Sequence, residues 1–124
     1  MGKIERFEDI KAWEMAKDLV VTVYRITGKG RFVHDFGLRD QIRRAAISAM
    51  SNIAEGFERG SKAEFCRFLR IAKGSCGEVR SQLYIAQELE YVDRQEFVSA
   101  KTQAEDLSKA LSGFISYLVR GSAK

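Results

Sequence analysis

Few side chains of this 124-residue chain have the type and spacing that chemistry requires. The two cysteines, Cys66 and Cys76, lie in one predicted helix, where ten residues of rise place them ~15 Å apart, too far for a disulfide. The single histidine, His34, has no serine or cysteine at a spacing typical of a nucleophile pair, and two cysteines with one histidine are too few ligands for a tetrahedral metal site. We interpret Cys76 as core, Cys66 as nearer the surface and His34 as a loop residue, and expect neither metal nor cofactor.

Acid–base catalysis is also disfavoured by the spacing of the polar residues. Glu55 is the best candidate base and Arg44 lies on the same helical stripe, but eleven residues of helix separate the two by ~16 Å. No nucleophile or metal ligand accompanies either residue. We therefore expect that the protein is not an enzyme and that Asn52 and Glu55 make structural hydrogen bonds or ion pairs.

Basic side chains are the remaining candidates, and their distribution along the chain is uneven. The segment from Arg39 to Arg80 contains nine basic and five acidic residues, whereas the rest of the chain contains twelve of each. The whole formal charge of +4 therefore falls in this segment. The four cations of the predicted third helix, at positions 67, 70, 73 and 80, share one sector of roughly 140° on the side opposite the apolar stripe. The candidate nucleic-acid contacts are Arg39, Arg43, Arg44, Arg67, Arg70, Lys73 and Arg80.

Two functions remain open for this basic face. A stripe of cations is typical of nucleic-acid binding, although a pI near 9.2 is only mildly basic and no aromatic residues interleave the stripe for base stacking. The alternative is a protein-interaction scaffold, in which the same cations are buried against acids of a neighbouring subunit or partner. A merely solvated face would have the same composition.

Four amphipathic helices must position these residues. Apolar residues recur at helical spacing over about 9–27, 36–55, 62–89 and from 93 onward. The last two stripes alternate steps of three and four residues and are joined by a short turn, which is typical of antiparallel bundle helices. The chain has no proline, no strand signal and no apolar run of the ~20 residues that span a bilayer. The sequence predicts one all-α domain over residues 1–124, an antiparallel up-down-up-down four-helix bundle.

Local signals set the limits and faces of these helices. The apolar face of the first helix is expected to be Ile10, Trp13, Ala16, Val20 and Val23. The first helix should begin near Asp9, with Phe7 packing back on it. The predicted caps and stops of the other helices are Asp35, Gly56, Gly60 and the capping-box pairs Ser61–Glu64 and Asp93–Glu96.

The second helix has two apolar faces where a bundle helix needs only one. Its core face is Leu38, Ile42, Ala45, Ala49 and Ile53, and its far face is Ile47, Met50 and Ala54. The far face indicates an oligomer interface. The alternative is that these three apolar residues are simply exposed. Gly74 and Gly77 lie in the basic sector of the third helix at a cost of about 1 kcal/mol each relative to alanine, so we expect another backbone or a phosphate chain to approach closely there.

Several strings of the sequence resemble a known family. They are FEDI at 7–10, AW at 12–13, GL at 37–38, QIRRAA at 41–46, SNIAEGF at 51–57 and FCRFLRIAKGS at 65–75. Together they resemble the bacterial four-helix-bundle proteins encoded in intervening sequences of 23S ribosomal RNA genes. The family usually has a proline where this chain has Ala49 or Met50, so the second helix should be straighter here.

The resemblance implies properties that the residues alone do not. It implies a left-handed bundle that assembles into a homopentamer. It also implies a relation to accessory proteins of diversity-generating retroelements, which are similar bundles that bind nucleic acid and a reverse transcriptase. The expected partners are therefore further copies of the chain, RNA or DNA, and a reverse transcriptase-like protein, with no membrane. No signal peptide is indicated and the resemblance brings no catalytic residues, so we expect a non-catalytic cytoplasmic protein.

Overall fold

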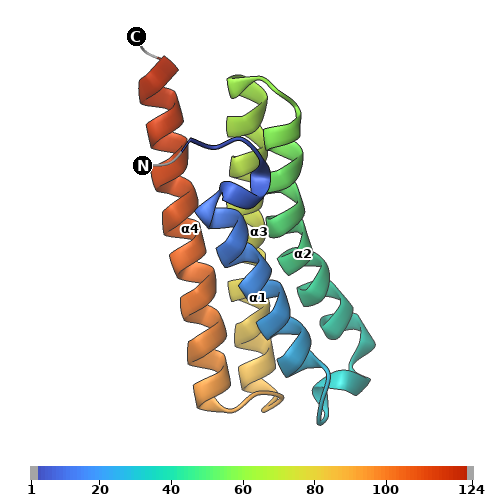
Figure 1. Cartoon of the computed structure of the whole chain (residues 1–124). Coiled ribbons are helices and arrows are strands. Elements are labelled where there is room, and N and C mark those ends of the chain that lie inside the picture. The colour runs from blue at the N-terminus through green and yellow to red at the C-terminus, as the bar shows by residue number, and fades with distance from the viewer. Residues whose placement is uncertain (1–2, 123–124) are drawn as a thin grey trace.

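The computed structural model describes residues 3–122, and within them it contains four α-helices and no strand. The helices are α1 (Lys11–Thr27), α2 (Phe36–Glu58), α3 (Lys62–Glu88) and α4 (Arg94–Ser122), with short 3-10 turns η1 (Phe7–Asp9) and η2 (Phe32–His34). The helices run side by side and the chain reverses direction at each connection (Figure 1). The predicted antiparallel four-helix bundle is confirmed.

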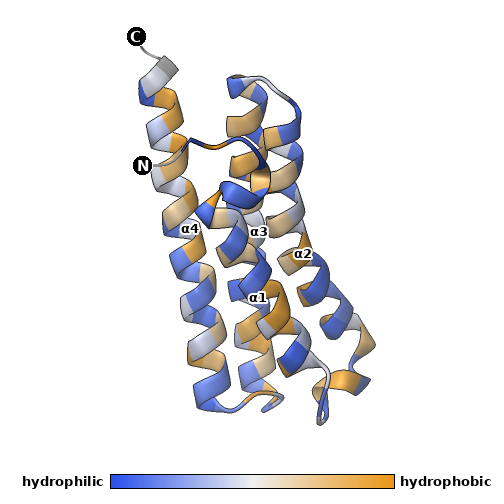
Figure 2. Cartoon of the chain, viewed as in Figure 1, coloured by the Kyte–Doolittle hydropathy of each residue, from blue (hydrophilic) through white to orange (hydrophobic). Residues whose placement is uncertain are grey.

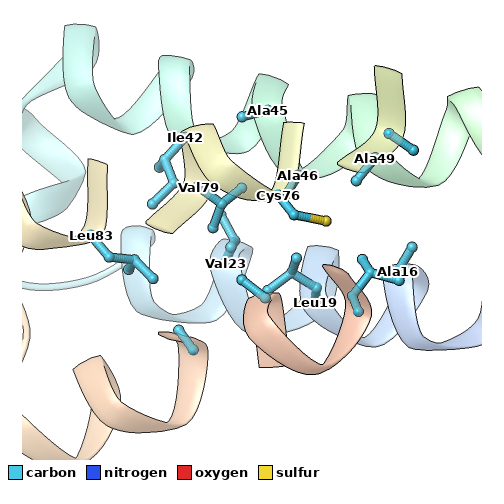
Figure 3. Close-up of a cluster of buried hydrophobic side chains, with 14 of the residues drawn as sticks. Ala16, Leu19, Val23, Ile42, Ala45, Ala46, Ala49, Cys76, Val79 and Leu83 are labelled. Atoms are coloured by element: carbon cyan, nitrogen blue, oxygen red, sulfur yellow. The ribbon is translucent and has the colours of Figure 1, made fainter. Parts of the chain in front are cut away.

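Each helix places its apolar stripe in a shared interior. Figure 2 shows hydrophobic and hydrophilic residues alternating by face along every helix, and Figure 3 shows side chains of α1, α2 and α3 meeting in the centre. Leu19, Cys76 and Val79 are all fully buried in this cluster. The predicted heptad stripe of α3 is buried except for Phe65, which is half-buried; its members are Phe65, Leu69, Ala72, Cys76, Val79, Leu83 and Ala86. In α4, Phe114 and Leu118 are partly buried against the core. The most extensive contact is between α2 and α3.

The first helix is rotated relative to the sequence prediction. Trp13 and Val20 are only half-buried, whereas Leu19, which was not predicted, is fully buried. Phe7 of η1 packs back on the helix as predicted, with its ring edge-on to Trp13 at 5.2 Å. The buried residues of α1 are Ala12, Ala16, Leu19, Val23, Ile26 and Thr27.

The start of α1 also differs from the prediction. Asp9 belongs to η1 and its carboxylate accepts hydrogen bonds from the backbone amides of Glu5 and Arg6, at 3.1 and 3.3 Å. The helix begins two residues later, at Lys11. The acidic side chain therefore caps the preceding turn rather than the helix.

Gly56 was predicted to end α2, and this prediction is wrong. The helix continues to Glu58, and Gly60, with φ of +85°, makes the turn into α3. Gly56 is buried, and a Cβ atom at this position would lie 2.6 Å from the Cβ of Phe68. Glycine is required there because the backbones of α2 and α3 approach too closely for a side chain.

The predicted capping residues act at the expected places. The Asp35 carboxylate accepts from the Leu38 amide at 3.1 Å, and the Ser61 hydroxyl accepts from the Glu64 amide at 3.1 Å. The Glu64 carboxylate contacts Arg67 instead of returning to Ser61, so only half of this capping box is made. The box before α4 is reciprocal, with both bonds present between Asp93 and Glu96.

Candidate nucleic-acid interface

The predicted basic residues divide into those that the fold engages and those that it leaves free. Arg43 is engaged, because its Nε donates to the Thr27 hydroxyl at 2.8 Å and its guanidinium lies 4.3 Å from the centre of the Tyr24 ring. Thr27 is itself fully buried and donates to the Val23 carbonyl at 2.7 Å. Arg43 therefore joins α2 to the last turn of α1.

Arg39 is held by the loop before its own helix. Its Nη1 donates to the Val33 carbonyl at 3.0 Å, and its Nε donates to Asp40 at 2.9 Å. The hydrogen bond from Arg39 lowers the pKa of the Asp40 carboxyl below its ordinary value. The guanidinium also lies 4.8 Å from the centre of the Phe36 ring. Its charge is largely balanced within the chain.

Arg80 is engaged by α4. One of its terminal nitrogens lies 3.7 Å from the Glu105 carboxylate, which also accepts from Lys101 at 2.9 Å. The hydrogen bond from Lys101 is the main cause that lowers the pKa of Glu105. Arg80 and Lys101 thus share one acid of α4, and Arg80 lies on the flank of α3 that faces α4.

Of the seven predicted nucleic-acid contacts, three are exposed and make no hydrogen bond, ion pair or ring contact within the part of the chain that the structure describes: Arg44, Arg70 and Lys73. Arg67 is intermediate, because it is exposed but pairs with Glu64 at 3.1 Å and lies 4.6 Å from the Phe68 ring centre. The free cations are the ones that can reach a phosphate without breaking an internal contact.

The free cations do not form one tight cluster. Ser48 of α2 contacts Ser75 of α3, so the antiparallel helices place Arg44 ~9 Å along the bundle from Lys73 and ~14 Å from Arg70. Lys73 lies two turns before Arg80 and so faces the α4 flank of the third helix. The three charges therefore form a spaced band across α2 and α3 rather than a pocket for one anion.

The predicted structural polar residues make their contacts along α2 itself, and Ser48, which Asn52 contacts, joins α2 to α3. The Asn52 side chain donates to the Ser48 carbonyl and hydroxyl at 2.8 and 2.9 Å, and the Ser75 hydroxyl donates to Ser48 at 2.9 Å. Glu55 pairs with Arg59 one turn later at 3.0 Å. Both residues make structural contacts in the fold. Arg44 and Glu55 make no contact with each other.

The candidate oligomer-interface residues are of two kinds. Ile47, Met50 and Ala54 are half-buried, and Met50 packs against the core. Gly74 and Gly77 are exposed, and a Cβ atom at either position would meet nothing within 4 Å. Within the single chain, no close approach accounts for these two glycines.

The cysteines are both free and both buried. Cys76 lies in the core cluster at 0% exposure, and Cys66 is 6% exposed outside that cluster, so Cys66 is the nearer of the two to the surface, as predicted. Burial raises the pKa of the Cys76 thiol to about 11, so this thiol is un-ionised at neutral pH. Among residues 3–122, no three metal-ligating side chains of His, Cys, Asp or Glu gather together, and no helix is long and apolar enough to cross a membrane.

One cluster was missed by the sequence analysis. The α1–α2 loop and the turn before α4 form a hollow of ≈ 610 Å³ at one end of the bundle, and Phe36 at its rim is 61% exposed. The residues that line it are Arg31, His34, Asp35, Phe36, Gly37 and Tyr91. The mixture of basic and aromatic residues in RFVHDF at 31–36 was the available signal.

The fold and this surface define a four-helix-bundle protein with a band of free cations on its two middle helices. The chain belongs to the 23S rRNA-intervening sequence protein family, whose model matches residues 8–113. The crystal structure of a protein of unknown function from the S23 ribosomal protein family of Bacteroides thetaiotaomicron has a similar fold. Its TM-score is 0.76 with 23% identity, covering 84% of this chain and 97% of that chain. A search of curated proteins found no match.

Proposed function

We propose that the protein is a non-catalytic, oligomeric adaptor that binds RNA or DNA through the free cations of α2 and α3. The observation that carries the proposal is the exposure of Arg44, Arg70 and Lys73 on the two middle helices without an ion pair in the described chain. Contact with phosphates would release bound counterions and would cost no internal ion pair. Arg67 adds a fourth contact if it leaves Glu64, whereas Arg39, Arg43 and Arg80 serve mainly to hold the fold.

The test is nucleic-acid binding measured at several salt concentrations. A variant with Arg44→Ala, Arg70→Ala and Lys73→Ala is expected to weaken binding to all sequences alike and to reduce the salt slope by ~2–3. A matched control removes the same charge from exposed residues elsewhere, as in Arg25→Ala, Arg94→Ala and Lys109→Ala. An equal loss of affinity in both variants would show that binding depends only on the net charge of the protein. No binding by the wild-type protein at low salt would refute the proposal.

The oligomer is proposed as a homopentamer, in keeping with the family resemblance. Its proposed interface uses the half-buried face of Ile47, Met50 and Ala54, and the exposed Gly74 and Gly77. Light scattering on the purified protein should give the mass of five chains, and the mass of a single chain would contradict the assembly. We further propose a cytoplasmic location, a relation to retroelement accessory proteins and, with that relation, a reverse transcriptase-like partner.

A protein-interaction scaffold is the second candidate, and the open space beside Gly74 and Gly77 favours it. In that case Arg70 and Lys73 would pair with acids of a neighbouring chain. Their replacement by alanine would then lower the oligomeric mass, whereas a nucleic-acid adaptor keeps its mass and loses affinity. Measuring both the oligomeric mass and the nucleic-acid affinity of the variant that lacks Arg70 and Lys73 therefore separates the two functions.

A further inference from the structure

The hollow at the end of the bundle is built from two distant segments. Asp35 and Tyr91, which are 56 residues apart in the sequence, are joined there by a hydrogen bond of 2.9 Å from the Tyr91 hydroxyl. The α1–α2 loop and the α3–α4 turn lie at the same end of the bundle in Figure 1. The site is therefore a product of the antiparallel topology.

The floor of the hollow is fixed without any ligand. The Tyr91 ring lies 5.1 Å from the ring of Phe32, which is fully buried. The Arg31 guanidinium lies 5.4 Å from the centre of the Tyr91 ring and donates a hydrogen bond to the Leu89 carbonyl at 2.6 Å. These contacts hold two planar groups in place, so binding would require little further ordering.

The rim of the hollow has an exposed aromatic ring, Phe36, whose centre lies 4.8 Å from the Arg39 guanidinium, so a base would stack on the remaining exposed surface of the ring. Phe36 is the most exposed of the large apolar side chains in the described residues, at 61%. It is the first residue of α2, and the Asp35 cap fixes the backbone beside it. An exposed aromatic ring next to arginines is the combination that binds bases of single-stranded nucleic acid, because every base has a face that can stack.

We propose that this hollow binds an unpaired nucleobase, which stacks on Phe36 while Arg31 and His34 face its sugar and phosphate. The proposal rests on the proposed nucleic-acid function and adds to it a preference for single strands. Arg31 and Asp35 carry opposite charges, so the hollow suits a planar base better than an isolated anion. The hollow is shallow and open to solvent, so a base would stack on its surface rather than be enclosed.

The experiment compares a labelled single-stranded oligonucleotide with a duplex of the same length, by fluorescence anisotropy. Phe36→Ala is expected to weaken single-strand binding roughly 5- to 100-fold and to leave duplex binding nearly unchanged. Phe36→Trp keeps an aromatic ring and should restore single-strand binding. Tyr117→Ala is the matched control, because Tyr117 is 58% exposed on α4 and does not line this hollow.

The following results would overturn the inference. Unchanged single-strand affinity in Phe36→Ala, or equal loss for single strand and duplex, would remove the stacking role. A fall in oligomeric mass would assign Phe36 to a subunit interface instead. If single-strand binding is lost only in the variant lacking Arg44, Arg70 and Lys73, the base site fails and the adaptor survives, whereas a wild-type protein that binds neither probe refutes both.

Discussion

Gly56 and Gly74 lie in the interiors of neighbouring helices, and the fold uses them in opposite ways. Gly56 is buried where α2 and α3 touch, and a Cβ there would lie 2.6 Å from the Cβ of Phe68. Gly74 is exposed on the outer side of α3, and a Cβ there would meet no atom within 4 Å. The first glycine permits a contact inside the chain, and the second has no such contact to permit.

The difference between these regions separates the structural part of the molecule from its candidate functional part. The contact of α2 with α3 extends from the close packing at Gly56 to the hydrogen bond between the Ser75 and Ser48 side chains. The outer side of α3 has free cations and open backbone, and neither feature stabilises the single chain. A residue that costs helix stability without a packing reason is best explained by a partner.

Gly56→Ala should have the largest effect. The added methyl group meets the Cβ of Phe68, whose position is fixed by the backbone of α3, so a change of side-chain rotamer cannot relieve the contact. The two helices must separate, so we expect the free energy of unfolding to fall by about 1–3 kcal/mol. Urea denaturation followed by circular dichroism measures the change, and wild-type stability in this variant would show that the helices do not approach as closely as described.

Gly74→Ala should have a smaller effect of opposite sign. Alanine is the better helix former and meets no neighbour within the chain, so the free energy of unfolding should rise by about 1 kcal/mol when the protein is diluted to single chains. In the assembled protein the same methyl group should weaken association if Gly74 faces another chain. Light scattering measures this second effect, and an unchanged mass would remove Gly74 from the interface.

Glu105→Gln tests the α4 flank of α3 and should have the smallest effect. Hydrogen bonding from Lys101, with the nearby charge of Arg80, lowers the pKa of Glu105 below its ordinary value of 4.5. A lowered pKa means that the folded state favours the carboxylate, so its stabilising effect is present above pH 4.5 and is lost as the pH falls through the folded value. The wild-type protein should therefore be slightly more stable than the variant at pH 7 and equal to it well below pH 4. A difference that persists in acid would show that Glu105 acts through packing rather than charge.

Residue patterns predicted the parts of the fold that depend on local spacing. The heptad stripe of α3 and the capping residues Asp35 and Ser61 follow from the period of the helix and the needs of its first turn. The face of α1 was predicted only in part, because which side of the helix turns inward depends on the helices that pack against it. Gly56 was misread for the same reason, since a buried glycine and a terminating glycine look alike until the neighbouring helix is in place.

The candidate site divides in a similar way. The excess of cations between Arg39 and Arg80 is a property of composition, so the sequence determined it, together with four amphipathic helices and their antiparallel order. Which cations remain free was decided only by tertiary packing, because Thr27 engages Arg43 and Glu105 engages Arg80 from other helices. The basic and aromatic string at 31–36 is visible in the sequence, but the hollow itself was decided by tertiary structure, since a pocket exists only when distant segments meet, and no local period encodes that meeting.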